Sequence, residues 1–185
     1  MEMTRRQAVI KMAFAMGASV IGPRLLAAQF GGEPGLPASF SEEERALLDE
    51  IGETIIPATD VPGAKAVGIG AFIATMVQDC YPSEVQAAVR NGLSKIASLH
   101  EARFGVSFMS GAAKDRTELL NELDREQKAA HARGGPLHYF RVLKELTILG
   151  YFTSKIGCTQ ALRFVEVPGS YDGDAPYRKG EKAWF

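Results

Sequence analysis

The histidines and cysteines are the side chains of this sequence best suited to nucleophilic, acid–base or metal chemistry. None of His100, His131 and His138 has a His or Cys partner at the three- or four-residue spacing that places two ligands on one helix face. Cys80 and Cys158 form neither a CxxC pair nor a haem-attachment motif. We therefore expect surface or hydrogen-bonded histidines, and an independent enzyme with an unrecognised histidine site is an alternative.

Two further patterns suggest ligand sites but lack the context that those sites require. Gly68 and Gly70 suggest the start of a dinucleotide loop, but a third Gly is missing and the pair begins a predicted helix without a preceding strand. Asp172 and Asp174 alternate with Gly173, but the rest of a calcium-binding loop is missing, so we expect a turn. The sequence predicts no catalytic, cofactor or metal site in this chain.

The first 28 residues predict an export signal. Arg5 and Arg6 precede a short apolar stretch over residues 12–21, which is shorter than the roughly 20 residues that a bilayer-spanning helix needs. The arginine pair resembles a twin-arginine signal, and Arg24 beyond the apolar stretch fits that route. A general secretory signal and an N-terminal amphipathic helix of the fold are alternatives. We expect residues 1–28 to be a twin-arginine signal peptide and the protein to be periplasmic.

The remainder of the chain has the composition of one acidic globular domain. Of the 185 residues, 46% are hydrophobic and 23% are charged, which is typical of a chain that buries a core. Residues after position 28 include 17 basic and 21 acidic side chains, a net charge of −4. Because nucleic-acid binding needs a clustered basic face, we exclude that class of function.

The spacing of apolar residues predicts an all-α fold, a single-domain helical bundle of about five helices. A Gly/Pro-rich linker over residues 29–40 precedes the helical domain, which we expect over residues 41–156. Ser41 and Glu44 form a capping box that begins the first helix, and Pro57 ends it. We predict further helices over residues 69–80, 83–104, 113–131 and 137–155, and Gly105 ends the second of these. Their apolar positions include Ile73, Leu99, Leu143 and Leu149.

The segment between the first two helices is rich in turn-forming residues. Pro62 and Gly63 predict a type II-like turn, in which glycine supplies a positive φ. Such a turn accounts for the residue types of the segment without any binding role.

Residues 157–185 differ from the helical domain, because they are rich in aromatic, Gly and Pro residues and have no helical period. Aromatic side chains in an irregular segment need a surface to cover, and Trp and Tyr are favoured at protein interfaces. That surface is either the chain's own core or another protein. The candidates are Phe164, Pro168, Tyr171, Tyr177, Trp184 and Phe185.

Two separated stretches resemble the gluconate 2-dehydrogenase subunit 3 family. The N-terminal stretch comprises Leu48–Ile51 and Thr54–Ala64, of which the run IIPATDVPGA is the most specific part. The C-terminal stretch comprises Gly150–Ser154 with Gly157, then Val167–Gly173 and Trp184. With the leader and the linker, the resemblance covers most of the chain.

The resemblance implies a non-catalytic small subunit of a periplasmic complex that oxidises sugars or sugar acids. In such complexes the large subunit, of the glucose-methanol-choline oxidoreductase (GMC) family, holds FAD. A multihaem cytochrome c subunit often passes the electrons to the membrane, so membrane association comes only through the complex. The small subunit holds no cofactor and assists maturation and twin-arginine export of the flavin subunit.

The resemblance also favours a partner surface for the C-terminal aromatic residues. Cys158, at the junction between the helical domain and this segment, is then a candidate for a close contact or disulfide with the partner. A disulfide between Cys80 and Cys158 is the rival, and two buried thiols are the third possibility. The alternative function is a stand-alone periplasmic binding or structural protein.

Overall fold

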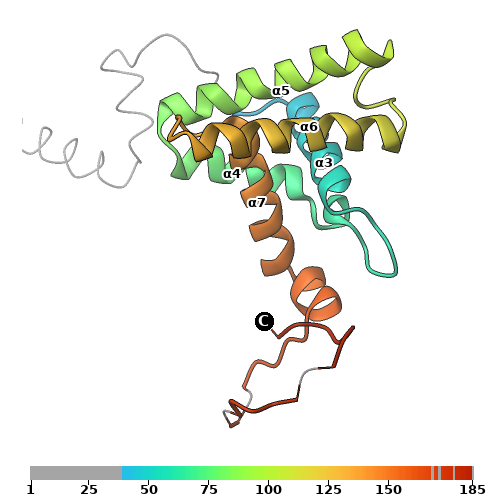
Figure 1. Cartoon of the computed structure of the whole chain (residues 1–185), viewed down its shortest axis with the longest axis vertical. Helices are drawn as coiled ribbons and strands as arrows, with labels where there is room; N and C mark the ends of the chain where they lie inside the picture. The colour runs from blue at the N-terminus through green and yellow to red at the C-terminus, as the bar shows by residue number, and fades with distance from the viewer. Residues whose placement is uncertain (1–38, 168, 171, 177, 185) are drawn as a thin grey trace, which may run out of the picture. The chain divides into compact units, whose positions relative to one another are not determined.

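The computed structural model describes residues 39–167, 169–170, 172–176 and 178–184 (Figure 1). The predicted signal peptide, with Arg5 and Arg6, lies outside the described residues, as does most of the predicted linker. In the described part of the chain, the structure consists of α3 (Glu42–Ile55), η1 (Ala64–Val67), α4 (Ile69–Cys80), α5 (Ser83–Phe104), α6 (Ala113–Ala132), α7 (Tyr139–Thr153) and η2 (Gly157–Ala161). Here η1 is a 3-10 helix and η2 a π-helix. The predicted all-α fold with five principal helices is confirmed.

The helices begin and end close to the predicted positions because local capping determines them. In the capping box, Glu44 N donates to Ser41 Oγ over 3.1 Å, and Ser41 N donates to the Glu44 carboxylate over 2.8 Å. Gly105 ends α5 in the left-handed conformation, with φ of 73°. α7 begins later than predicted, at Tyr139, because His138 caps it by accepting a hydrogen bond from the Phe140 backbone.

Close contacts at glycine bring α3, α4 and α7 together around Ile69, which is fully buried. A Cβ at Gly52 of α3 would lie 2.5 Å from Ile69 Cγ2, and one at Gly150 of α7 would lie 2.6 Å from Ile69 Cδ1. A Cβ at Gly70 would lie 2.3 Å from the Arg45 carbonyl oxygen. Because real side chains do not tolerate such distances, these helix approaches require glycine.

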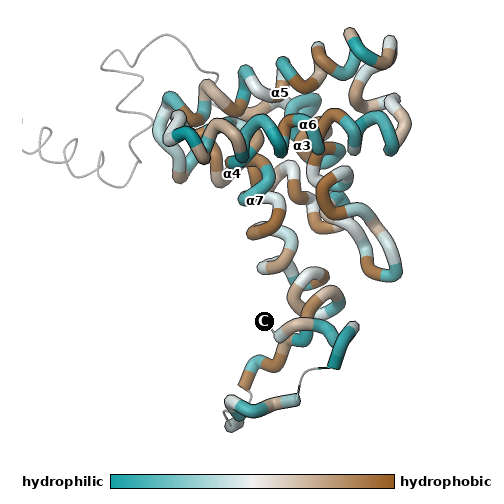
Figure 2. The backbone as a smooth tube through the Cα atoms, viewed as in Figure 1, coloured by the Kyte–Doolittle hydropathy of each residue, from teal (hydrophilic) through white to brown (hydrophobic). Residues whose placement is uncertain are grey.

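α5 and α6 run antiparallel beside one another and complete the bundle (Figure 1). Apolar and polar residues alternate along both helices in Figure 2, as expected for helices with one face on a core. Phe108, in the connection between them, is buried. Leu99 of α5 and Leu149 of α7, which the periodicity places on apolar faces, are exposed. Phe40, at the end of the predicted linker, is buried and has the Arg90 guanidinium 4.1 Å from its ring centroid.

No helix among the described residues has both the length and the apolar character that crossing a membrane requires.

Asp124 links α6 to α7 through ion pairs. Its carboxylate accepts from Lys144 Nζ of α7 over 2.7 Å and pairs with Lys128 Nζ of α6 at 2.7 Å. Partial burial raises the pKa of Asp124, but hydrogen bonds from Lys128, Lys144 and Gln127 outweigh that effect and lower the pKa to about 2. The ionised carboxylate therefore stabilises the folded state.

The Asp124 link predicts a specific dependence of stability on pH. Because the folded-state pKa is depressed, the contribution is present above the ordinary pKa and is lost as the pH falls towards about 2. We expect Asp124→Asn to lower the free energy of unfolding by about 1–2 kcal/mol near neutral pH. Urea unfolding between about pH 7 and pH 3 should show the difference from wild type shrinking as the pH falls. A difference that is constant across this range would contradict the assignment.

A second prediction concerns the packing of α5 against α7 at Gly92. A Cβ there would lie 2.2 Å from the Tyr139 ring, so Gly92→Ala should destabilise the fold by about 1–2 kcal/mol, although alanine favours a helix by about 1 kcal/mol. The matched control is Asn91→Ala, at an exposed position of the same turn, with an expected change within about 0.5 kcal/mol. Thermal unfolding of both variants measures the difference. Equal stabilities would contradict the tight contact.

Candidate functional site

The segment from Ile56 to Ala64, called the 56–64 loop below, is closed at its base. Ala64 N donates to the Ile56 carbonyl over 2.9 Å. The Glu53 carboxylate of α3 spans the loop ends, accepting from Ala58 N over 2.9 Å and from Lys65 N over 2.8 Å. The loop is therefore compact, with its ends held together by one backbone bond and by the Glu53 carboxylate.

Gly63 corrects the turn predicted from the sequence. Its φ is −77°, so it does not adopt the left-handed conformation expected for a type II turn. A Cβ at this position would instead lie 2.4 Å from both Glu53 carboxylate oxygens and 2.6 Å from Ala58 N. Glycine is needed because the carboxylate that closes the loop occupies the space of a side chain.

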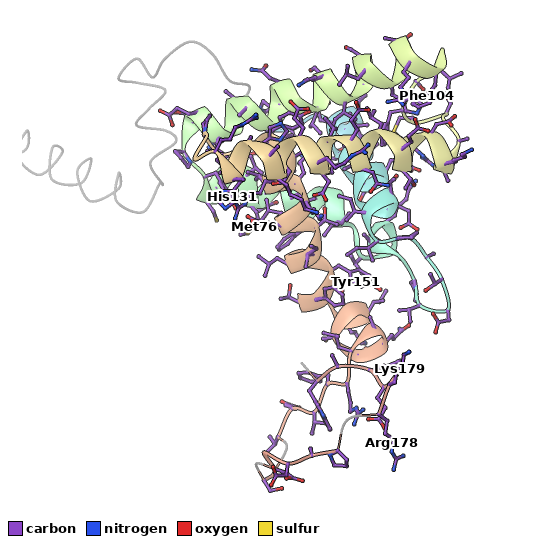
Figure 3. All side chains as sticks on the ribbon, in the orientation of Figure 1. Met76, Phe104, His131, Tyr151, Arg178 and Lys179 are labelled. Carbon is purple, nitrogen blue, oxygen red and sulfur yellow. The ribbon has the colours of Figure 1, made fainter. Side chains whose placement is uncertain are left out.

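Tyr151 of α7 joins the loop to the end of the bundle. Its hydroxyl donates to the Pro62 carbonyl over 2.8 Å, and Figure 3 labels the side chain near the end of α7. Burial, with smaller effects of the Glu53 and Asp60 carboxylates, raises the pKa of Tyr151 above its ordinary value. The hydroxyl therefore remains a donor at neutral pH. This bond joins the two sequence stretches that carried the family resemblance, which lie 89 residues apart at this contact.

An ion-pair network around Glu50 holds Lys65, the residue that follows the loop. Lys65 Nζ lies 2.7 Å from Glu50 Oε2, and Arg116 of α6 contacts the other Glu50 oxygen. Burial raises the pKa of Glu50. The Lys65 hydrogen bond and the positive charges of Arg116 and Lys65 outweigh that effect, so the net shift of the pKa is downward. Lys65 is thus bound to α3 by its side chain and by its backbone.

A shallow cleft of about 360 Å³ lies beside the loop. It is lined by Glu50, Glu53, Ala58, Pro62, Gly63, Lys65 and Ala66. The Glu50 and Lys65 charges satisfy one another, and Glu53 is occupied by backbone donors. The cleft therefore offers its shape, backbone groups and charges that are already paired.

The three histidines lie in separate environments. His100 is fully buried between Phe104 and Phe108, and its Nδ1 lies 2.9 Å from the Val106 carbonyl, whereas its Nε2 has no hydrogen-bond partner among the described residues. His138 caps α7, and His131 is exposed on α6. The expectation of surface or hydrogen-bonded histidines thus holds, except that one nitrogen of His100 is buried without a partner. Over the described residues, no group of three or more His, Cys, Asp or Glu side chains could hold a metal ion.

A second cleft, of about 330 Å³, lies between α6 and α7. It is lined by Gln127, Lys128, His131, Ala132, Arg141, Lys144, Glu145 and Ile148. The three lysine and arginine side chains at its wall are paired with acids: Asp124 with both lysines, and Glu145 with Arg141. The cleft is therefore part of the link between α6 and α7.

Both cysteines are free thiols in the structure. Cys80, the last residue of α4, is exposed, and Cys158, in η2, is half-buried with its thiol 3.6 Å from the Lys155 carbonyl. The structure thus contains neither the Cys80–Cys158 pair nor two buried thiols. A disulfide from Cys158 to a partner stays a prediction.

Two of the predicted interface aromatics are described, and both are exposed. Phe164 is 45% and Trp184 60% accessible, so neither belongs to the chain's own core. The other four candidates, Pro168, Tyr171, Tyr177 and Phe185, lie outside the described residues. The C-terminal segment begins with the π-helix η2, which the sequence did not predict, and the turn expected near Asp172 is present, where the carboxylate accepts from Asp174 N.

Comparison with known families identifies the chain. The family model described as Gluconate 2-dehydrogenase subunit 3 matches residues 42–169. The chain belongs to the gluconate 2-dehydrogenase subunit 3 family. The match begins with α3, contains the 56–64 loop and Tyr151, and confirms the resemblance seen in the sequence. Comparisons with curated proteins and with solved structures found no match.

Sequence reasoning missed Glu53 as the residue that organises the loop. It lies in the last turn of α3, where an acidic residue is unfavourable to the helix dipole, because the carbonyl end is negative. That misplaced charge is the only signal in the sequence that could have identified it.

Tyr151 and Tyr139 of α7 form a matched pair for testing the loop contact. Tyr151→Phe removes the donor to Pro62, so it should lower the free energy of unfolding by about 0.5–1.5 kcal/mol and speed amide exchange over residues 57–63. The Tyr139 hydroxyl is buried without a hydrogen-bond partner among the described residues, so Tyr139→Phe should cost no stability. Unchanged exchange in the loop of Tyr151→Phe would contradict the role of this bond.

Proposed function

We propose that this chain is the non-catalytic small subunit of a periplasmic dehydrogenase complex that oxidises a sugar or sugar acid. Its partner is a large GMC-type subunit that holds FAD, and a multihaem cytochrome c subunit accepts the electrons. The small subunit assists maturation of the flavin subunit and carries it through the twin-arginine route. The observation that carries the proposal is the family match over residues 42–169, because the family is described as a subunit of a dehydrogenase.

The geometry supports a role in protein binding. The 56–64 loop is held by Glu53 at its base and by Tyr151 at Pro62, so the segment most typical of the family has a fixed shape. A surface that is already ordered loses little conformational entropy on binding, which favours association. In the described part of the chain, the carboxylates near this loop already have partners and none is positioned beside a histidine.

The electron path of the proposed complex runs through the partner subunits. FAD in the large subunit would accept the hydride of the substrate and pass electrons on to haem. This chain contributes surface, so the sugar specificity would lie in the flavin subunit. Cys158 remains the residue proposed for a covalent or close contact with that subunit, and its thiol is free and half-buried.

The direct test is purification of the tagged chain from cells that also produce the flavin subunit. We expect a flavoprotein to co-purify, with flavin absorbance and with dye-linked oxidation of a sugar or sugar acid that the chain alone lacks. A non-reducing gel of the same sample shows whether Cys158 links the two. Recovery of the chain alone, colourless and monodisperse, would overturn the proposal and favour a stand-alone binding or structural protein.

Export is tested separately by the arginine pair. The double variant Arg5→Lys, Arg6→Lys keeps the charge but should block twin-arginine transport. The amount and the activity of the flavin subunit should then fall sharply in the periplasm and rise in the cytoplasm. The matched control is Arg24→Lys, which keeps the charge outside the pair and should leave export unchanged. Normal periplasmic activity with both arginines replaced would contradict the proposed carrier role.

A further inference from the structure

The C-terminal loop is defined here as residues 162–184, and its described residues fold without contributing to the core. The buried core residues, and the partly buried ones packed on them, lie between Phe40 and Ala161. The stability of the bundle therefore does not explain why the described residues of this loop fold back on themselves. Most of the loop also lies beyond the matched family region, which ends at residue 169.

Arg163 closes the loop by four contacts with its far end. Its backbone N donates to the Ala183 carbonyl over 2.8 Å, and its guanidinium lies 4.3 Å from the centroid of the Trp184 ring. The same guanidinium donates to the Glu181 carboxylate over 3.2 Å and to the Lys182 carbonyl over 3.3 Å. Each contact is modest at a half-exposed position, but all four act on one side chain and its backbone.

A second tether joins the closed end to the bundle. Lys182 Nζ donates to the Gln160 carbonyl of η2, and η2 follows directly from α7, where Ser154 Oγ accepts from Gly157 N over 3.0 Å. Arg163, Glu181 and Lys182 are thus used for the internal closure of the loop and for its attachment.

Four large apolar side chains among the described residues of the loop lie on the outside. Val167 is 79% exposed and Trp184 60%, and Phe164 and Val165 are also exposed. In a folded segment this is the reverse of the usual distribution, and several exposed apolar side chains within one short segment favour an interaction site. Trp and Arg are both among the residue types that are enriched at the centres of protein interfaces.

The net charge of the loop indicates which kind of partner it could bind. Residues 162–184 contain four basic and four acidic side chains, so the loop has no net charge. Anionic lipid surfaces and nucleic acids need a basic cluster, so neither is favoured. A protein surface with an apolar patch is favoured, and the family description names a subunit of a multisubunit dehydrogenase.

We propose that Arg163 is a positioning residue that closes the C-terminal loop and presents Val167 and Trp184 as a preformed docking surface for the flavin-containing large subunit. This inference rests on the proposed function for the identity of the partner. The closure itself is a property of the free chain, so it is measured independently of any partner.

The closure test uses Trp184, the single tryptophan of the chain. Arg163→Ala should lower the fluorescence anisotropy of the free, full-length chain, because the ring loses the guanidinium and the loop opens. The matched control is Arg178→Ala, which removes the same charge from the same loop. Arg178 is 80% exposed, extends outward in Figure 3, and lies 3.9 Å from the Glu181 carboxylate, so its removal should leave the anisotropy unchanged. Equal anisotropy in wild type and Arg163→Ala would overturn the positioning role.

The docking test titrates the FAD-loaded large subunit with each full-length variant. Arg163→Ala should raise the dissociation constant roughly five- to thirtyfold, Arg178→Ala should leave it within about twofold, and the circular dichroism of all variants should match wild type. Val167→Glu places a charge on the surface without touching the closure, so it should weaken binding while leaving the anisotropy unchanged.

The outcomes separate the two proposals. If Arg163→Ala and Val167→Glu both bind the large subunit with the affinity of the wild type, the docking surface is overturned and the accessory function stays intact. A wild-type chain that does not bind the large subunit overturns the accessory function, and the docking inference with it.

Discussion

The structure depends on one steric constraint, the insertion of Ile69 between Gly52 of α3 and Gly150 of α7. Neither glycine could carry a side chain without moving the fully buried Ile69. The three helices therefore meet at closer range than ordinary side chains allow, and dense packing makes such a contact sensitive to single methyl groups. This contact fixes how closely the last turns of α3 and α7 approach Ile69, and the 56–64 loop and Tyr151 lie in or beside those turns.

In the proposed function, this constraint helps to present the backbone of the 56–64 loop to a partner protein, and it serves no chemical step. The Glu53 carboxylate and the Tyr151 hydroxyl are both used to fix the loop, and Glu50 is used to hold Lys65 and Arg116. Around this loop, Glu53 and Tyr151 are thus directed at main-chain groups and Glu50 at two basic side chains. Such a use of polar groups fits a subunit that acts by shape, and its membership in a dehydrogenase subunit family agrees with it.

Much of the helical frame could be predicted because local signals determine it. The Ser41–Glu44 capping box, Pro57 and Gly105 set helix ends by local geometry, and apolar periodicity identified the core positions around Ile73 and Leu143. The candidate site was harder to predict from the sequence, because it is made by contacts between residues that are distant in the chain. The bond from Tyr151 to Pro62 spans 89 positions, and Gly63 is required by the Glu53 carboxylate rather than by its own φ. The exposure of Leu99 and Leu149 likewise depends on which helices pack there, which periodicity does not reveal.

Hydrogen–deuterium exchange of the chain, alone and bound to the flavin subunit, tests the central claim most directly. If the chain is an accessory subunit that binds through its preformed surfaces, exchange should slow on binding over residues 57–63 and 162–184. Exchange over the exposed faces of α5 and α6 should stay unchanged. Slowing confined to α5 and α6, or no slowing anywhere in the presence of the flavin subunit, would contradict the account.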